Sequence, residues 1–398
     1  MSSRPTVAVL FGSRSVEHEV SVVTAMQILA NIDRNKYNVV PVYIDKQGRW
    51  LTGKGLENLE SFKSLALRDA SKFLEISPSA TPTRAMIEPL RSGLLSPKIP
   101  RIDVVFPALH GTFGEDGTVQ GLLELANIPY VGCGVTASAV GMDKVLQKAI
   151  FKQVGLNVVK HSWFFRETYQ QNPESIIKNL EKELPYPMIV KPANLGSSVG
   201  ITLAKNRETL QEAIEVAQAF DRKILVEEVV QDMIEINCSV LGWKTLEASV
   251  CEQPVKHDEF LSYKDKYMGG GKKAGTKDAP AKGSSKGMAS LARLVPAPIP
   301  EPLAKQIQEM AKVAFRSIDG SGIARIDFMV TTTRGKVTPQ SKVYINEINT
   351  LPGSFSFYLW EATGVQFVTL IDKLIDIAIE RQHDKNTTTF SIDSKLLG

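Results

Sequence analysis

The first third of the chain alternates short apolar runs with stretches of helical periodicity. A short apolar run is typical of a buried strand, whereas apolar residues three or four positions apart are typical of a helix. We expect strands at residues 7–11, 39–44 and 104–109 and helices at about 19–32 and 119–126. Strands that alternate with helices indicate an open, mostly parallel sheet. The weaker pattern of residues 47–101 indicates an insertion into this unit.

Beyond residue 142 the pattern changes to a small α+β unit and then to a strand-rich region that starts near Ile234. We expect helices at about 143–155, 208–219 and 367–380 and strands at 188–191 and 224–228. The first of these helices has a predicted apolar face of Val145, Leu146, Ala149, Ile150 and Val154. A polar tail follows the last helix.

Two acidic strand segments near the C-terminus carry the strongest functional signal. Side chains alternate faces along a strand, so Arg325 and Asp327 share one face. Glu347 and Asn349 share a face of the second segment for the same reason. A turn-rich stretch between them can close a hairpin. Asp327 and Glu347 are equidistant from its centre, so we expect these two residues to lie opposite each other.

The facing carboxylates allow two interpretations. Like charges across strands are destabilising unless a cation neutralises them, and Mg²⁺ binds through one or two carboxylates together with substrate phosphates. The alternative is a solvated strand face whose acids hold no ligand. Ile326, Phe328, Ile345 and Ile348 surround the acids and favour buried strands, in which carboxylates need partners.

Composition limits the classes of partner. The 398 residues are enough for two or three domains. The net charge of +4 is small for this length, and no apolar run approaches the ~20 residues of a membrane span, so neither a nucleic-acid nor a membrane partner is indicated. Cys133, Cys238 and Cys251 are widely spaced without a CxxC pair, which is typical of reduced thiols in a cytosolic protein.

A turn rich in glycine and serine follows the strand that ends in Lys191. Small residues at Gly196, Ser197, Ser198 and Gly200 let backbone N–H groups approach an anion closely. Lys191 would add a positive charge. The turn matches neither the GxGxxG fingerprint nor a P-loop, so taken alone it is either an ordinary turn or an anion-binding loop.

Further polar residues stand near strand ends, where open α/β sheets bind their ligands. Glu227 and Glu228 close one strand and Glu235 precedes the next; they are either solvated or contact adenine and ribose. His110 follows another strand and is either structural or part of a ligand site. Glu17 follows the first strand and should converge on the same crevice.

Taken together, these motifs closely resemble the D-alanine–D-alanine ligase family of the ATP-grasp superfamily. The resemblance covers about residues 7–381, with the motifs in order. They lie at 12–21, 109–121, 132–144, 191–200, 263–267, 325–327 and 346–353. The resemblance implies an α/β, three-domain ATP-grasp fold. Its parts would be an N-terminal open parallel-sheet domain (1–142), a central ATP-grasp subdomain (143–232), a C-terminal ATP-grasp and metal-binding domain (233–385) and a tail (386–398).

The resemblance also implies a role for each matched residue in ATP and metal binding. Lys144 and Lys191 would hold the phosphates of ATP, beneath a glycine-rich lid of Ser198, Val199 and Gly200. Adenine and ribose would be contacted by Glu227, Glu228 and Glu235. Two Mg²⁺ (or Mn²⁺) ions would be held by Asp327, Glu347 and Asn349.

The amino-acid substrates would be bound by a second group of residues. Glu17 would bind the ammonium of the first D-alanine and form a hydrogen-bonded triad with Ser197 and Tyr267. His110 would help to orient that substrate. Arg325 and the N–H of Gly353 would stabilise charge on the reacting carboxyl, while Lys266 would face the carboxylate of the acceptor.

Two segments differ from the family pattern. An acyl phosphate must be kept from water, which requires a lid. The expected lid, at about 262–295, is longer and richer in lysine than is usual; its composition alone predicts a mobile loop. The segment from Gly353 to Trp360 is shortened, and the serine that normally binds the acceptor carboxylate lacks a clear counterpart. Ser354 or Ser356 could replace it.

The predicted function is ATP-dependent synthesis of D-alanyl-D-alanine for peptidoglycan through a D-alanyl phosphate, by a cytoplasmic homodimer. The alternatives are a ligase that accepts D-lactate or D-serine, and an ATP-binding regulator without turnover. Lys266 and Tyr267 favour an amine acceptor, and the presence of Arg325 argues against a regulator. Nucleic-acid binding is disfavoured because the lysine-rich loop lacks interleaved aromatic residues and the chain lacks overall basicity.

Overall fold

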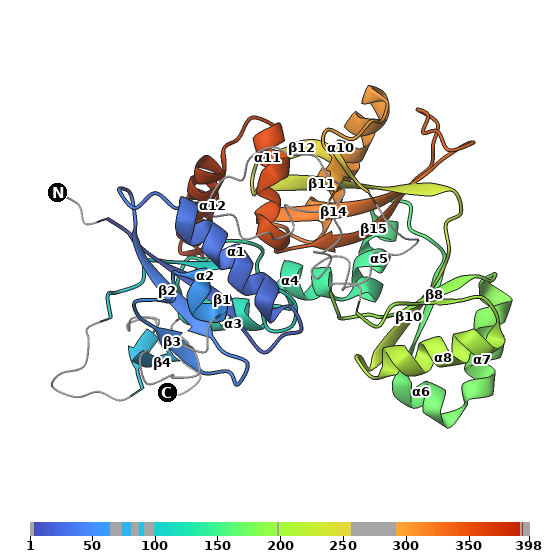
Figure 1. The fold of residues 1–398 in the computed structure, drawn as a ribbon, viewed down its shortest axis with the longest axis horizontal. Helices are drawn as coiled ribbons and strands as arrows, with labels where there is room; N and C mark the ends of the chain where they lie inside the picture. The colour runs from blue at the N-terminus through green and yellow to red at the C-terminus, as the bar shows by residue number, and fades with distance from the viewer. Residues whose placement is uncertain are drawn as a thin grey trace.

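The structure, a computed structural model, describes residues 4–63, 74–80, 87–90, 99–196, 199–255, 292–390 and 392. Within these residues the strands form sheets of six, four and five strands. The six-stranded and four-stranded sheets lie at opposite ends of the molecule, with the five-stranded sheet between them (Figure 1). No helix in this part of the chain is long and apolar enough to cross a membrane.

The N-terminal sheet has the order β5-β4-β3-β2-β1-β6. Its strands are β1 (Thr6–Gly12), β2 (Asn38–Ile44), β3 (Trp50–Thr52), β4 (Leu74–Pro78), β5 (Ile87–Pro89) and β6 (Val104–Pro107). Strand β1 pairs in parallel with β2 and β6, as predicted, whereas β3, β4 and β5 are antiparallel. The predicted insertion therefore widens the sheet. The accompanying helices are α1 (His18–Asn31), α2 (Leu59–Lys63), α3 (Thr118–Leu125) and α4 (Val135–Met142).

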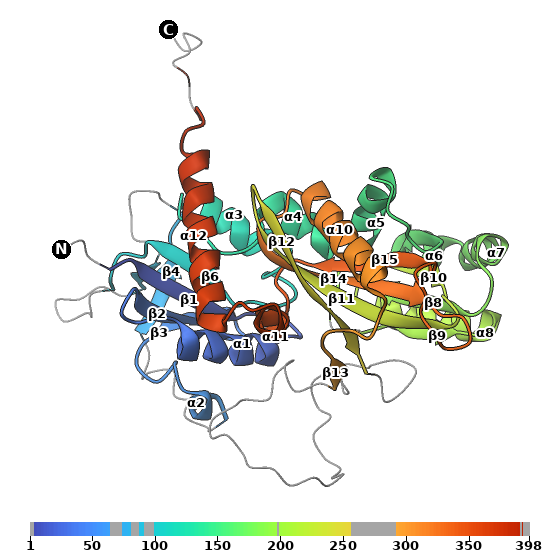
Figure 2. The same cartoon turned by 90° about the horizontal axis from the view of Figure 1, so that it is seen from above.

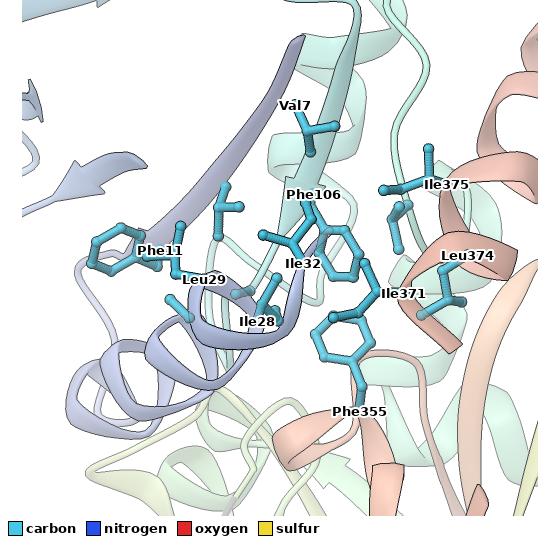
Figure 3. Close-up of a cluster of buried hydrophobic side chains, with 14 of the residues drawn as sticks. Val7, Phe11, Ile28, Leu29, Ile32, Phe106, Phe355, Ile371, Leu374 and Ile375 are labelled. Atoms are coloured by element: carbon cyan, nitrogen blue, oxygen red, sulfur yellow. The ribbon is translucent and has the colours of Figure 1, made fainter. Parts of the chain in front are cut away.

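Alternate residues of β1 face two different cores. Ala8 and Leu10 face α3, and Val7, Val9 and Phe11 face α1 and the C-terminal helix α12 (Phe367–Lys385). Figure 3 shows side chains of β1, α1 and α12 converging around Phe106 and Phe355, whose ring centroids lie 5.0 Å apart. Helix α12 thus completes the N-terminal core, although it comes last in the chain (Figure 2).

The central unit is an antiparallel sheet of order β7-β10-β8-β9 with helices against one face. Its elements are β7 (His161–Phe165), α6 (Arg166–Gln171), α7 (Pro173–Glu183), β8 (Met188–Pro192), β9 (Thr202–Ala204), α8 (Arg207–Gln218) and β10 (Lys223–Glu228). Val190 and Val226 pack in the core with α7 and α8. Because side chains alternate, the neighbouring Lys191 and Glu227 lie on the opposite face.

The five-stranded sheet has the order β13-β12-β11-β14-β15. Its strands are β11 (Met233–Gly242), β12 (Leu246–Pro254), β13 (Arg293–Leu294), β14 (Gly322–Thr331) and β15 (Val343–Asn349). The helices of this part of the chain are α5 (Lys144–Gln153), α10 (Glu301–Ser317) and α11 (Phe357–Ala362), with the 3-10 turn η4 (Gly353–Ser356) before α11. A core between α10 and this sheet leaves the other face available for polar side chains.

Helix α5 corrects one sequence prediction. It begins after Asp143, whose side chain accepts hydrogen bonds from the N–H groups of the first turn. Of the predicted apolar face, Leu146 and Val154 are exposed. The buried residues are Lys144, Val145, Gln147, Lys148 and Phe151. Polar side chains point inward because strands far away in the sequence offer them partners.

Candidate active site

A cavity of about 720 Å³ lies between the four-stranded and five-stranded sheets. It brings together most of the residues singled out in the sequence, from both units. They are Lys144, Lys191, Glu227, Glu228, Glu235, Arg325, Asp327, Glu347 and Asn349. Residues more than 200 positions apart, such as Lys144 and Asn349, therefore meet around one volume large enough for a nucleotide-sized ligand.

The acidic hairpin forms as predicted. Asp327 of β14 lies directly opposite Glu347 of β15, and Arg325 lies opposite Asn349. The Nε and one Nη of Arg325 each donate to a carboxylate oxygen of Asp327 at 2.7 Å. The side-chain amide of Asn349 donates to Asp327 at 3.1 Å. The two hydrogen bonds from Arg325 fix the plane of the Asp327 carboxylate.

The electrostatics of the hairpin fit a bound cation. Burial raises the pKa of Asp327, and the carboxylates of Glu347 and Glu235 raise it further, while Arg325 opposes them. Among the described residues no group of three or more His, Cys, Asp or Glu side chains forms a metal site by itself. Two carboxylates and an amide, completed by phosphate oxygens, instead suit Mg²⁺.

Lysines occupy the side of the cavity that faces the hairpin. The Nζ of Lys144 donates to the carbonyl of Leu195 at 2.9 Å and lies 3.4 Å from Glu347. Lys191 is paired with Glu227. These contacts place two positive charges beside the glycine- and serine-rich turn and beside the acidic hairpin.

Glu227, which was predicted to contact adenine and ribose, lines the cavity and is paired with two lysines in this structure. Its side chain is 2% exposed, and its carboxylate lies between Lys191 and Lys148, with 2.7 Å to Lys148. Burial alone would raise the pKa of Glu227, but the two lysines bring it down to about 2. The carboxylate therefore stays ionised and forms ion pairs with both lysines. Glu228 is partly exposed and accepts from the N–H of Lys160 at 3.1 Å.

Glu17 reaches from the N-terminal unit to the glycine-rich turn. Its side chain is buried, and glycines leave room for it. A Cβ on Gly196 would lie 2.6 Å from a carboxylate oxygen of Glu17, and a Cβ on Gly111 would lie 2.7 Å from it. Val199 and Gly200 continue the turn, with Gly200 at φ +74°. Ser197, Ser198, Lys266 and Tyr267 lie outside the described residues, as does most of the expected lid.

His110, which was predicted to help orient the first substrate, is buried with both ring nitrogens engaged. Nδ1 lies 3.0 Å from the carbonyl of Leu351 and must donate to it, so Nε2 accepts from the Thr24 hydroxyl at 2.9 Å. Thr24 in turn accepts from the N–H of Ser354 at 3.3 Å. Burial lowers the pKa of His110 to about 4, so the ring stays neutral. It holds the segment around Gly353.

The shortened segment after Gly353 forms a strained turn. Ser354, Phe355 and Ser356 have φ of 53°, 51° and 48°, a left-handed conformation that costs non-glycine residues about 1–3 kcal/mol each. Ser356 is fully buried, does not line the cavity, and its hydroxyl has no hydrogen-bond partner among the described residues. The predicted contact of Ser356 with the acceptor carboxylate stays a prediction, because in this structure the hydroxyl does not face the cavity.

Sequence reasoning assigned no role to Glu115, which lines the cavity, or to Lys148, which lies buried behind Glu227. Glu115 lines the cavity and accepts from the N–H of Gly111 at 2.7 Å and of Leu351 at 3.3 Å. Burial and the charge of Glu17 raise the pKa of Glu115 to about 8. Lys148 is the other residue. Its spacing of one helical turn from Lys144 was the signal that could have identified it.

Comparisons with known proteins agree with this geometry. The family models described as D-ala D-ala ligase N-terminus and C-terminus match residues 6–133 and 150–376. The chain is 40% identical to a D-alanine–D-alanine ligase of Thermosipho melanesiensis, covering 98% of each chain. It is 41% identical to that of Bacillus cytotoxicus, covering 97% of this chain and 99% of the relative.

Solved structures give the same result. The D-alanine-D-alanine ligase from Coxiella burnetii superposes with a TM-score of 0.78 at 30% identity, covering 97% of each chain. The VanG D-Ala:D-Ser ligase from Enterococcus faecalis superposes with a TM-score of 0.77 at 31% identity, covering 94% of this chain and all of that one. The expected ATP-grasp architecture is thereby confirmed, and the chain belongs to the D-alanine–D-alanine ligase family.

Proposed function

We propose that this protein is an ATP-dependent ligase that joins two D-alanine molecules through a D-alanyl phosphate, for peptidoglycan synthesis. One observation carries the proposal: a single cavity unites Lys144 and Lys191 with the facing pair Asp327 and Glu347 and with Arg325. Phosphoryl transfer depends mainly on positioning and on charge neutralisation, which these residue types provide. The curated relatives are D-alanine–D-alanine ligases over nearly the whole chain.

In the first half-reaction a carboxylate oxygen of the first D-alanine attacks the γ-phosphorus of ATP, the bond to the β,γ-bridging oxygen breaks, and ADP leaves as D-alanyl phosphate forms. Lys144 and Lys191 bind the phosphates, with Ser198, Val199 and Gly200 above them. Asp327, Glu347 and Asn349 would hold two Mg²⁺ or Mn²⁺ ions, which when bound neutralise phosphate charge. Glu228 and Glu235 remain the proposed contacts for adenine and ribose, while Glu227 supports the lysines.

In the second half-reaction the neutral amine of the second D-alanine attacks the carbonyl carbon of the acyl phosphate. The C–N bond of the dipeptide forms, the C–O bond to phosphate breaks, and phosphate leaves with the proton that the amine loses. Glu17 holds the ammonium of the first D-alanine, in a triad with Ser197 and Tyr267. Arg325 and the N–H of Gly353 stabilise the oxyanion that forms, because a cation and a backbone donor favour developing negative charge. Lys266 would bind the acceptor carboxylate.

The wider organisation remains part of the proposal. We assign residues 1–142, 143–232 and 233–385 to the N-terminal, central and C-terminal parts, with a lid at about 262–295. The proposed enzyme is a cytoplasmic homodimer. Its six-stranded, four-stranded and five-stranded sheets lie within these successive parts of the chain, which supports the division.

Phosphate release tests the function. The purified protein with ATP, Mg²⁺ and D-alanine alone should release phosphate and form D-alanyl-D-alanine, identified by mass spectrometry. Addition of D-serine or D-lactate should produce little mixed product. If phosphate release requires D-lactate or D-serine, the protein is instead a ligase that uses that acceptor. ATP binding without turnover for any of these substrates would indicate a regulator.

A further inference from the structure

Lys148 is a lysine in the protein interior that the proposed reaction does not use. Its side chain is 0% exposed. The Nζ lies 2.7 Å from the carboxylate of Glu227 and donates to the carbonyl of Asn346 at 3.0 Å. A buried ammonium group is costly unless it is paired and hydrogen-bonded, and these two contacts supply both requirements.

Glu227 forms ion pairs with two lysines, so one negative charge faces two positive charges. Lys148 and Lys191 both contact this one carboxylate. Burial lowers the pKa of Lys148 and the charge of Glu227 raises it; with all three groups ionised, the buried cluster carries a net charge of one positive unit. If Glu227 paired with Lys191 alone, the pair would be neutral and would attract phosphate weakly. Lys148 therefore supplies the excess positive charge from behind the cavity wall, while Lys191 and Glu227 line the cavity itself.

Lys148 also acts on the acidic hairpin. It binds the carbonyl of Asn346, and the side chain of Gln147 accepts from the N–H of Ile348 at 2.9 Å. These two contacts hold the backbone of β15 on both sides of Glu347. One turn of α5 thus connects the lysine cluster of the central unit to the strand that carries the proposed metal ligand.

We infer that Lys148 is a positioning residue for phosphate binding: it lets Glu227 orient Lys191 without cancelling its charge, and it keeps Glu347 in register. This inference rests on the proposed function, because it takes Lys191 as a phosphate ligand. The charge effect should act on the β- and γ-phosphates of the nucleotide and leave the base and ribose unaffected.

The test compares binding of ATP and AMP to the full-length protein in one Mg²⁺-containing buffer, by calorimetry and by competition. Lys148→Met removes the charge and leaves the Glu227–Lys191 pair intact. It should weaken ATP binding at least about tenfold, equivalent to about 1.4 kcal/mol, with little change for AMP. Lys152→Met is the matched control, because Lys152 is an exposed lysine on the same helix.

A second variant separates charge from simple loss of packing. Lys148→Met combined with Glu227→Gln leaves Lys191 with a neutral partner and restores the net positive charge. This double variant should recover most of the ATP-to-AMP affinity ratio, although kcat stays low because the β15 contact is still missing. A wild-type ratio in Lys148→Met, or a double variant no closer to wild type than the single one, would overturn the inference.

The binding ratio also keeps this inference separate from the proposed reaction. Wild-type protein that binds ATP but releases no phosphate with D-alanine would contradict the ligase function. The ATP-to-AMP ratio of the Lys148 variants would still decide the role of Lys148, because it is measured without turnover.

Discussion

Replacing His110 by asparagine should remove the loss of stability that this buried histidine causes on acidification. The His110 ring is neutral in the folded protein, because burial lowers its pKa from 6.5 to about 4. In the unfolded chain the ring takes up a proton near its ordinary pKa. Between these two values the unfolded state binds more protons, so stability is full above pH 6.5 and falls as the pH drops towards 4.

The magnitude follows from the same two values. At about 1.4 kcal/mol per pKa unit, the full loss from this residue is roughly 3 kcal/mol. Between pH 7 and pH 5 the linkage relation gives about 2 kcal/mol. Asparagine keeps a donor near the position of Nδ1, so the bond to the Leu351 carbonyl can be retained while the titrating group is lost.

Urea unfolding at pH 7 and pH 5 measures this effect, with tryptophan fluorescence, including that of the buried Trp360, as the probe. The wild-type protein should lose about 2 kcal/mol more than His110→Asn on acidification. Glu115 acts in the opposite direction, because its raised pKa favours the folded state at low pH, but it is present in both proteins. His383→Asn, at an exposed position, is the control. An equal loss in wild type and His110→Asn would refute the reasoning.

Three further outcomes are expected. Glu347→Gln should lower phosphate release by about a hundredfold or more with little change in Tm, because the carboxylate would hold the metal ions that neutralise charge on the transferred phosphate. Phosphate release at the wild-type rate would contradict the metal assignment. Gly196→Ala would set a Cβ 2.6 Å from Glu17, so the KM for the first D-alanine should rise. Gly121→Ala, with open space around it, should leave that KM unchanged. Thr24→Val removes the hydroxyl that bonds to the buried imidazole and should cost about 1–3 kcal/mol in urea unfolding.

The local sequence pattern was sufficient to predict the acidic hairpin. Side chains alternate along a strand, and the segment between the strands is short, so the pairing of Asp327 with Glu347 follows from counting residues. The same holds for β1, whose apolar run is buried on both faces. The resemblance of the motifs to a known family then led to the cavity residues that the structure brings together.

The sequence by itself therefore determined the parallel strands around β1, strands β8, β10, β14 and β15, helices α1, α3, α5, α8 and α12, the fold family and the ligands that share one strand face, because each depends on neighbours in the chain. It did not predict strands β3 to β5 of the insertion, strand β7 or helices α4, α6, α7, α10 and α11. Only the tertiary structure decided which charges are buried and what they contact. Lys148 meets Asn346 at a separation of 198 residues, and His110 meets Leu351 at a separation of 241. From the sequence, a lysine on a helix or a histidine after a strand is predicted to be solvated or to bind a ligand. Its burial becomes favourable only when a segment far away in the sequence supplies a hydrogen-bonding partner.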